Sequence, residues 1–159
     1  MAYAATLREA SREQLHMGKS ASYFLSRIIK GGLLDVERVI SAMREAGSVE
    51  SRGFAWTIVD IEEGTTSYHK KPYRYLAGRL VKYDPDAFVE VVDEATRRTR
   101  LQSEPNMQRA ASLFVYLPDE AIFGHKRVWN EIRATDFRTQ LAAITNQATI
   151  YLTFDRLPV

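Results

Sequence analysis

Cysteine is absent from the 159 residues of this chain, and histidine occurs only three times. Disulfide bonds, thiol nucleophiles and zinc sites built on thiolates are therefore excluded. The histidines, His16, His69 and His125, show no metal-ligand spacing and have no acidic residue beside them in a recognisable motif. We interpret them as surface or capping residues, and we expect neither a metal site nor a cofactor.

Long apolar runs are also absent, since no stretch approaches the eighteen or so apolar residues of a membrane-spanning helix. Residues 1–14 alternate Ala with Arg and Glu and lack the apolar core of a signal peptide. The absence of cysteine suits a reducing compartment. We therefore expect a cytoplasmic protein that has no membrane partner.

The chain carries little net charge, +2 from 22 basic and 20 acidic residues, so its charge alone does not require a nucleic-acid partner. An apolar fraction of 45% is typical of globular proteins, and this length fits one domain. Phosphate-binding glycine loops, a dinucleotide fingerprint and a glycine-flanked serine elbow are missing. These absences exclude several enzyme classes.

The first third of the chain has helical patterns. Residues 3–16 are rich in good helix formers, and residues 20–30 carry apolar side chains at helical spacing before two glycines. Residues 33–46 place Leu, Val, Ile and Met on one stripe. We predict a helical segment over residues 1–47.

Strand patterns dominate the rest of the chain. We predict strands over residues 54–61, 73–83, 88–94, 112–117, 121–125 and 149–154. We expect a turn over residues 62–67 and a long loop or extended edge over residues 96–108. The turn at residues 84–86 predicts an antiparallel hairpin of the second and third strands. That pairing places Glu90, Asp93 and Glu94 opposite Arg74, Arg79 or Lys82.

Two further helices are expected near the C-terminus. One covers residues 126–134, and a second, capped by Thr135 or Asp136, carries Phe137, Leu141 and Ile144 on one face. Trp56 and Trp129 lie among apolar residues and are predicted to be core residues.

The order of these elements indicates an α+β protein: N-terminal helices, then an antiparallel sheet of about five or six strands with a C-terminal helix packed on it. Residues 1–47 and 48–159 are expected to form one domain in all. A regular βαβ alternation is absent, which argues against a doubly wound nucleotide-binding fold. Because the chain ends abruptly at Val159 after its last predicted strand, a longer parent protein is a further expectation.

The most informative stretch is residues 73–83, because the two faces of this predicted strand differ. One face carries tyrosines around an arginine, and the other carries a leucine pair with basic residues at its ends. Cations with aromatic rings are typical of single-strand nucleic-acid binding, but tyrosine and arginine are also favoured at protein interfaces. The candidate residues, for nucleic acid or a partner subunit, are Lys70, Lys71, Tyr73, Arg74, Tyr75, Arg79, Lys82, Arg97, Arg98 and Arg100.

Three hypotheses for function follow. We favour a non-catalytic binding module that uses these basic and tyrosine residues. A metal-dependent phosphodiesterase or nuclease using Asp84, Asp86 and Glu90 is the first alternative, since converging carboxylates hold a metal and activate water. Their spacing matches no nuclease motif, and a solvated turn explains the same residues. An oligomeric scaffold whose N-terminal helices supply the interface is the second alternative.

The order of segments between residues 54 and 145 also resembles a known kind of domain. The resemblance is carried by the Tyr75–Tyr83 run ahead of an acidic strand, the Ser112–Leu117 strand with its hairpin to Ile122 and His125, and the helix with Phe137. It is to uncharacterised prokaryotic domains found near mobile elements and phage-defence genes. It implies a bacterial defence or accessory role, with no catalytic residues to carry over.

Overall fold

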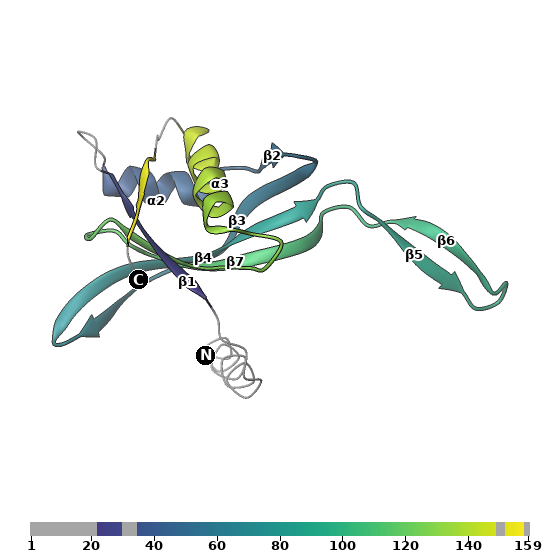
Figure 1. Cartoon of the computed structure of the whole chain (residues 1–159), viewed down its shortest axis with the longest axis horizontal. Helices are drawn as coiled ribbons and strands as arrows, with labels where there is room; N and C mark the ends of the chain where they lie inside the picture. The colour runs from purple at the N-terminus through teal and green to yellow at the C-terminus, as the bar shows by residue number, and fades with distance from the viewer. Residues whose placement is uncertain (1–21, 30–34, 149–151, 158–159) are drawn as a thin grey trace.

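The computed structural model describes residues 22–29, 35–148 and 152–157 (Figure 1). Within these ranges, seven strands form one antiparallel sheet in the order β2-β3-β4-β7-β8-β1-β9, and β5 and β6 form a separate hairpin. The elements are β1 (Tyr23–Ile28), α2 (Val36–Glu45), β2 (Val49–Ser51), β3 (Phe54–Tyr68), β4 (Lys71–Asp84), β5 (Phe88–Asp93), β6 (Arg98–Ser103), β7 (Met107–Leu117), β8 (Ile122–Lys126), α3 (Ala134–Asn146) and β9 (Phe154–Arg156).

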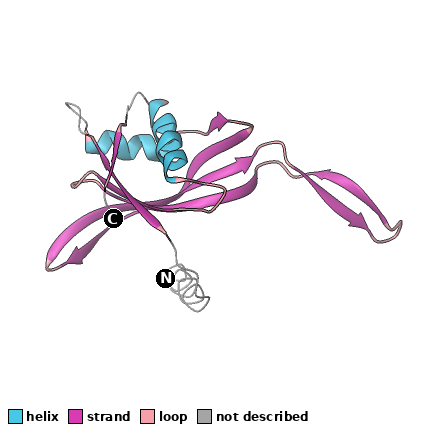
Figure 2. Cartoon of the chain, viewed as in Figure 1, coloured by secondary structure: helices cyan, strands magenta, loops and turns pink. Residues whose placement is uncertain are grey.

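Both described helices lie on the same side of the curled sheet (Figure 2). The core lies between these helices and the sheet. Helix α2 contributes Val39, Ile40 and Met43, and α3 contributes Phe137, Leu141 and Ile144. The strands contribute Leu76, Leu80, Phe114, Tyr116 and Phe123, all at most 1% exposed. This arrangement confirms the α+β class and the antiparallel sheet.

Each helix begins at a defined cap. Asp35 caps α2, since its carboxylate accepts a hydrogen bond from the Glu37 N–H at 3.0 Å. At α3, the N–H of Arg133 donates to the carboxylate of Asp136 at 2.9 Å. Asp136 was expected among the capping residues, and it acts from the third position of the helix rather than at the cap itself.

Strands β3 and β4 form the longest hairpin of the sheet. His69 and Lys70 join them with positive φ angles of 48° and 63°, which is the geometry of a two-residue type I′ turn. A bulge between Val59 and Glu62 shifts the register and bends β3. At the other end of β4, Asp84 accepts a hydrogen bond from the Asp86 N–H, so the chain turns at Pro85 as predicted.

Strands β5 and β6 form a hairpin that projects from the body of the molecule (Figure 1), and we call residues 85–106 the arm. The arm continues the β4–β7 ladder. The Glu104 N–H donates to the Ala87 carbonyl at 2.8 Å, and the Asn106 N–H donates to the Pro85 carbonyl at 3.3 Å. In the described chain, both long edges of the arm lack a further strand.

The predicted helix over residues 20–30 is wrong, because its described part forms β1 in the sheet. Ser26 and Ile28 point into the core and are 1% exposed, whereas Leu25 points outward. The true period is therefore two, and pairing with β8 and β9 overrides the helical spacing. The prediction for residues 33–46 is confirmed by α2, and the one for residues 3–16 lies outside the described residues.

Two irregular predictions in the middle of the chain are also wrong. The expected turn over residues 62–67 is the outer half of β3, and the expected loop over residues 96–108 contains β6 and the start of β7. β6 is exposed along its whole length, so it has no apolar alternation to detect. Residues 88–94 do form a strand, but it pairs with β6 rather than with β4. The main sheet has seven strands rather than five or six, because β1 and β2 join it although β5 does not.

Near the C-terminus, the predicted helix over residues 126–134 is absent. Val128 pairs with Ile132 in an isolated bridge, and a turn lies between them. Trp129 is 64% exposed, with the Arg127 guanidinium 3.9 Å from its ring, so its predicted core position is wrong. Trp56, which is 5% exposed, is a core residue as predicted. Of the strand predicted over residues 149–154, residues 149–151 lie outside the described residues, and among the rest only Phe154 belongs to a strand, β9.

Candidate functional site: an open sheet face

The sheet surface opposite α2 and α3 carries many partly exposed apolar side chains, and we call this surface the open face. Paired residues share a face of an antiparallel sheet, so Val59, Arg79 and Leu113 form one row across β3, β4 and β7. A second row crosses Ala77, Val115, Gly124 and Leu25. Leu113 is 47% exposed and Val115 is 39% exposed. In the described parts of the chain, no helix covers this face.

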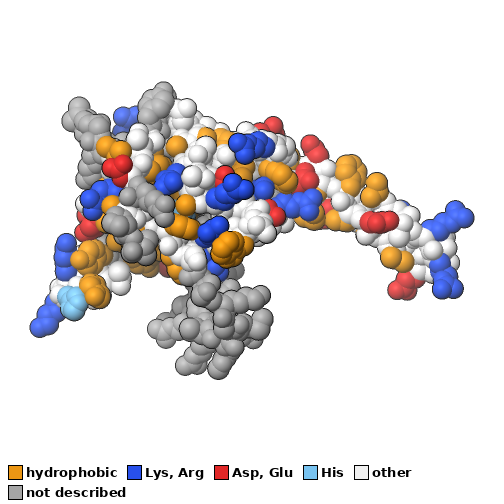
Figure 3. All heavy atoms as spheres, in the orientation of Figure 1, with side chains coloured by type: hydrophobic (Ala, Val, Ile, Leu, Met, Phe, Trp, Pro, Cys, Tyr) orange, Lys and Arg blue, Asp and Glu red, His pale blue; other side chains and the backbone are white. Residues whose placement is uncertain are grey.

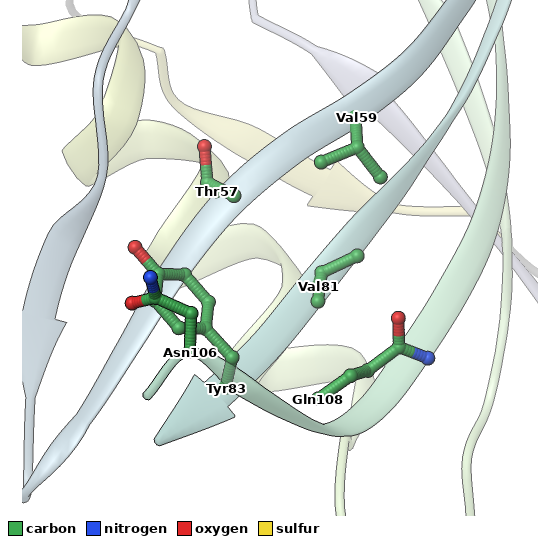
Figure 4. A pocket seen from close by; sticks show the side chains of 6 residues that line it. All are labelled: Thr57, Val59, Val81, Tyr83, Asn106 and Gln108. Carbon is green, nitrogen blue, oxygen red and sulfur yellow. The ribbon is translucent and has the colours of Figure 1, made fainter. Parts of the chain in front are cut away.

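A shallow groove of about 340 Å³ lies at one end of the open face (Figure 4). Its lining residues are Thr57, Val59, Val81, Tyr83, Asn106 and Gln108. These side chains come from β3, β4, β7 and the neck of the arm. The lining offers apolar surface with amide and hydroxyl groups at its rim and no carboxylate, so it suits contact with a surface rather than acid–base chemistry.

Arg79 is the central charged residue of the open face. Its Nε donates to the carboxylate of Asp60 at 2.9 Å, and Asp60 lies in the β3 bulge with φ 54°. The bulge thus aims this carboxylate at the guanidinium. Both side chains remain accessible, at 41% for Arg79 and 63% for Asp60. Arg79 is therefore held in place while it stays available to a partner.

Tyr73 and Tyr75 lie on the same face as Arg79. A methyl group on Gly64 would lie 2.7 Å from the Tyr75 hydroxyl oxygen, so the ring covers this glycine of the neighbouring strand. The Lys71 ammonium lies 4.8 Å from the centre of the Tyr73 ring and 3.5 Å from a carboxylate oxygen of Glu120. Four of the candidate residues, Lys71, Tyr73, Tyr75 and Arg79, thus share one face of β4 and are spread along it.

Arg74 and Lys82 lie on the opposite, helix-covered face. Arg74 donates to Glu37 of α2 at 2.5 Å and to Glu63 of β3 at 2.8 Å, and these hydrogen bonds hold the pKa of each carboxyl below its ordinary value. Lys82 contacts Glu131 at 3.1 Å and stacks 4.3 Å from the centre of the Phe54 ring. These two cations therefore link β4 to α2, to β3 and to the segment before α3.

The expected ion pairs between the acidic strand and the basic strand are therefore wrong. Arg74, Arg79 and Lys82 instead use carboxylates from α2, β3 and the segment before α3. The acidic residues of β5 lie on the arm, where their cross-strand neighbours are Leu101 and Arg98 of β6.

The remaining candidate cations lie at the tips of two hairpins. Lys70 lies in the β3–β4 turn, and Arg97, Arg98 and Arg100 lie at the far end of the arm. Figure 3 shows basic side chains gathered at that far end, with acidic and apolar ones along the arm. The structure thus divides the ten candidate residues among the open face, the helix-covered face and two tips.

The carboxylates of the nuclease hypothesis do not converge. Asp84 contacts the Asp86 N–H and the Arg109 guanidinium, the latter at 3.3 Å, and Glu90 lies further along the arm. Among the described residues, no group of three or more acidic, His or Cys side chains is arranged to hold a metal ion.

His125 is buried, so its assignment as a surface or capping residue is wrong. Its ring is 1% exposed and stacks parallel to the Phe137 ring, with centroids 4.0 Å apart. Burial lowers the pKa of His125 from 6.5 to about 4, and the charge of Arg138 adds to the effect. Its Nε2 has no hydrogen-bond partner among the described residues. His125 therefore occupies a position in the core that is surrounded by aromatic rings.

Several residues of the open face and the arm were not singled out from the sequence. Leu113 and Val115 alternate with the buried Phe114 and Tyr116, so the pattern identified the strand without showing which face the helices leave open. On the arm, the apolar residues Phe88, Val92 and Leu101 are 61–72% exposed. Their apolar character alone predicted burial.

No protein-family model, curated protein or solved structure matches this chain. The resemblance to prokaryotic domains near phage-defence genes stays a prediction. In the described ranges, no helix is long and apolar enough to cross a membrane.

Proposed function

We propose that this chain is a non-catalytic binding module that contacts a partner protein through its open face. The observation that carries the proposal is the group of partly exposed apolar side chains beside Arg79, on a sheet whose other face carries α2, α3 and the core. Contiguous exposed apolar surface of this kind is typical of interaction sites in proteins.

The composition of the open face supports a protein partner. Tyrosine and arginine are enriched at the centres of protein interfaces, and here they stand among Leu, Val and Ala. Strands β3, β4, β7, β8 and β1 contain 15, 14, 11, 5 and 6 residues, and at about 3.4 Å per residue and about 4.8 Å per strand they cover about 800 Å². A standard interface buries about 800 Å² on each partner, so the open face has a suitable size.

Photocrosslinking tests this proposal. A benzoylphenylalanine at Val115 is expected to crosslink to protein in the native host, because this side chain is accessible in the middle of the open face. Ser41, exposed on the outer side of α2, is the matched control position. Equal, background crosslinking from both positions would contradict the proposal.

Nucleic acid is the second candidate partner, and the basic hairpin tips favour it. Lys70 and the three arginines at the end of the arm have no carboxylate within ion-pair distance in the described structure. Labelled single- and double-stranded DNA and RNA would be titrated over a salt series. Phosphate contacts predict affinity that falls steeply with salt, whereas no binding at low salt removes this candidate.

We further propose a cytoplasmic location and an accessory role in a bacterial system such as phage defence. The support for this step is the resemblance over residues 54–145 together with the cysteine-free composition. Deleting the gene in its host and measuring phage infection would test it, and unchanged infection by a broad phage panel would argue against it.

A further inference from the structure

The arm has one apolar face that nothing in the described structure covers. Phe88, Val92 and Leu101 lie on this face, since Phe88 is opposite Ser103, Glu90 is opposite Leu101 and Val92 is opposite Thr99. They are 61%, 69% and 72% exposed. A two-stranded hairpin is marginal in water by itself, and three exposed apolar side chains on one face favour a partner.

The apolar face of the arm carries a single charge. Glu90 lies between Phe88 and Val92 along β5, and no cation lies within ion-pair distance of it in the described structure. On the open face, the cation Arg79 lies in a row between Val59 and Leu113, where it is paired with the exposed carboxylate of Asp60. Both surfaces are therefore apolar, and the carboxylate of Glu90 is complementary to the guanidinium of Arg79, which stays 41% exposed beside Asp60.

One chain cannot join its own two surfaces in this conformation. The arm continues the β4–β7 ladder outward, and Figure 1 shows it projecting beyond the sheet rather than folding back over it. Contact between the arm and an open face consequently requires two molecules.

We propose that the partner of the open face is the arm of a second copy of this chain, with Glu90 of one copy facing Arg79 of the other. The inference rests on the proposed function, because it names the partner of the same face. The apolar residues Phe88, Val92 and Leu101 pack over the row that contains Val59 and Leu113. In this complex the Arg79 guanidinium forms an ion pair with Glu90 of the other copy, either together with its contact to Asp60 or in place of it.

This contact joins two different surfaces, so it is heterologous. Each copy keeps one free arm and one free open face after the first contact, and repetition produces a ring if the rotation closes or a filament if it does not. A simple two-fold dimer is not the expected product.

The test is a charge swap followed by sedimentation velocity over a wide concentration range. The wild-type chain is expected to self-associate. Glu90→Arg and Arg79→Glu are each expected to weaken association about tenfold to a hundredfold, since each leaves two like charges facing one another. The chain with both changes restores the pair and should associate nearly as the wild type does. Glu104→Arg makes the same charge change on the neck of the arm and should have little effect.

Mixing variants tests the heterologous geometry. Leu101→Asn alters the arm and Leu113→Asn alters the open face, both at exposed positions where we expect the fold to be retained. Each variant alone is expected to be monomeric. An equimolar mixture should form one-to-one complexes, because one copy keeps its arm and the other keeps its open face. Circular dichroism confirms the fold of every variant.

The outcomes separate the inference from the proposed function. A monomeric wild type, a swap without rescue or mixed variants that do not associate overturns self-assembly through the arm. If crosslinks from Val115 then still reach another protein, the open face remains an interaction site with a different partner. Absence of both self-association and crosslinks overturns both.

Discussion

Replacing His125 with Phe is expected to remove a pH-dependent loss of stability. The imidazole lies between aromatic rings of the core, stacked on Phe137 and 5.8 Å from the ring of Phe24. A phenyl ring has a similar shape, fits the same aromatic surroundings and carries no polar atom that needs a partner. At neutral pH the variant should therefore be at least as stable as the wild type.

The expected size of the effect follows from the pKa of His125. In the unfolded chain the imidazole titrates near 6.5, and in the folded protein near 4, because burial disfavours the charged form. Between these two pH values the unfolded state binds more protons, so wild-type stability falls as the pH decreases. At about 1.4 kcal/mol per pH unit, the total loss is about 3 kcal/mol. Below pH 4 this contribution is fully lost, and above pH 6.5 it is fully present.

Urea unfolding at several pH values between 7 and 4 would measure this difference. The stability of the wild type minus that of His125→Phe should fall by about 3 kcal/mol over this range, while contributions from carboxyl groups cancel in the comparison. His69→Gln, at the exposed tip of the β3–β4 hairpin, is the matched control and should follow the wild type.

Titration of the histidine ring signals by NMR gives an independent measurement of the same quantity. A midpoint for His125 near 6.5 in the folded protein, or identical pH profiles of the wild type and His125→Phe, would refute the reasoning.

Three further outcomes are expected. Gly78→Ala should lower the free energy of unfolding by about 1–3 kcal/mol in urea, because the new methyl group would lie 3.0 Å from the buried Phe114 ring. Gly124→Ala is the control, since its methyl group would lie 3.5 Å from the nearest atom. Equal effects of the two changes would contradict this packing argument. Arg74→Leu should lower the melting temperature more at low salt than at high salt, because it removes ion pairs with Glu37 and Glu63, and a salt-independent effect would argue against them. Added magnesium or manganese should leave the melting temperature unchanged, since no three ligands lie together in the described chain, and a rise would revive the nuclease hypothesis.

The sequence predicted best those elements whose apolar pattern is produced by the core itself. Helix α3 is an example, since Phe137, Leu141 and Ile144 repeat at helical spacing and all point into the core. β1 was mistaken for a helix because its apolar residues are too few to separate the two periods. Its strand conformation depends on β8, about a hundred residues later, and no local pattern records that partner.

The candidate site was predicted only in part for a related reason. Alternation in residues 73–83 correctly separated Tyr73, Tyr75 and Arg79 from Arg74. It could not show that α2 and α3 cover the face of Arg74, because that choice is made by tertiary packing. The arm was missed because β5 alternates like an ordinary strand, whereas β6 has no apolar alternation, so nothing in the sequence showed that β5 pairs with β6 rather than with β4.

The position of β1 in the sheet has a consequence for the order of folding. Strands β3, β4 and β7, with the arm between them, can pair as the chain leaves the ribosome, because each pairs with a strand or ribbon close in sequence. β1 is synthesised before all of them, yet its partners β8 and β9 come last. Closing this long loop is entropically costly and slow. The β1–β8 pairing is therefore expected to form more slowly than the pairings of β3, β4, β7 and the arm, which join segments close in sequence.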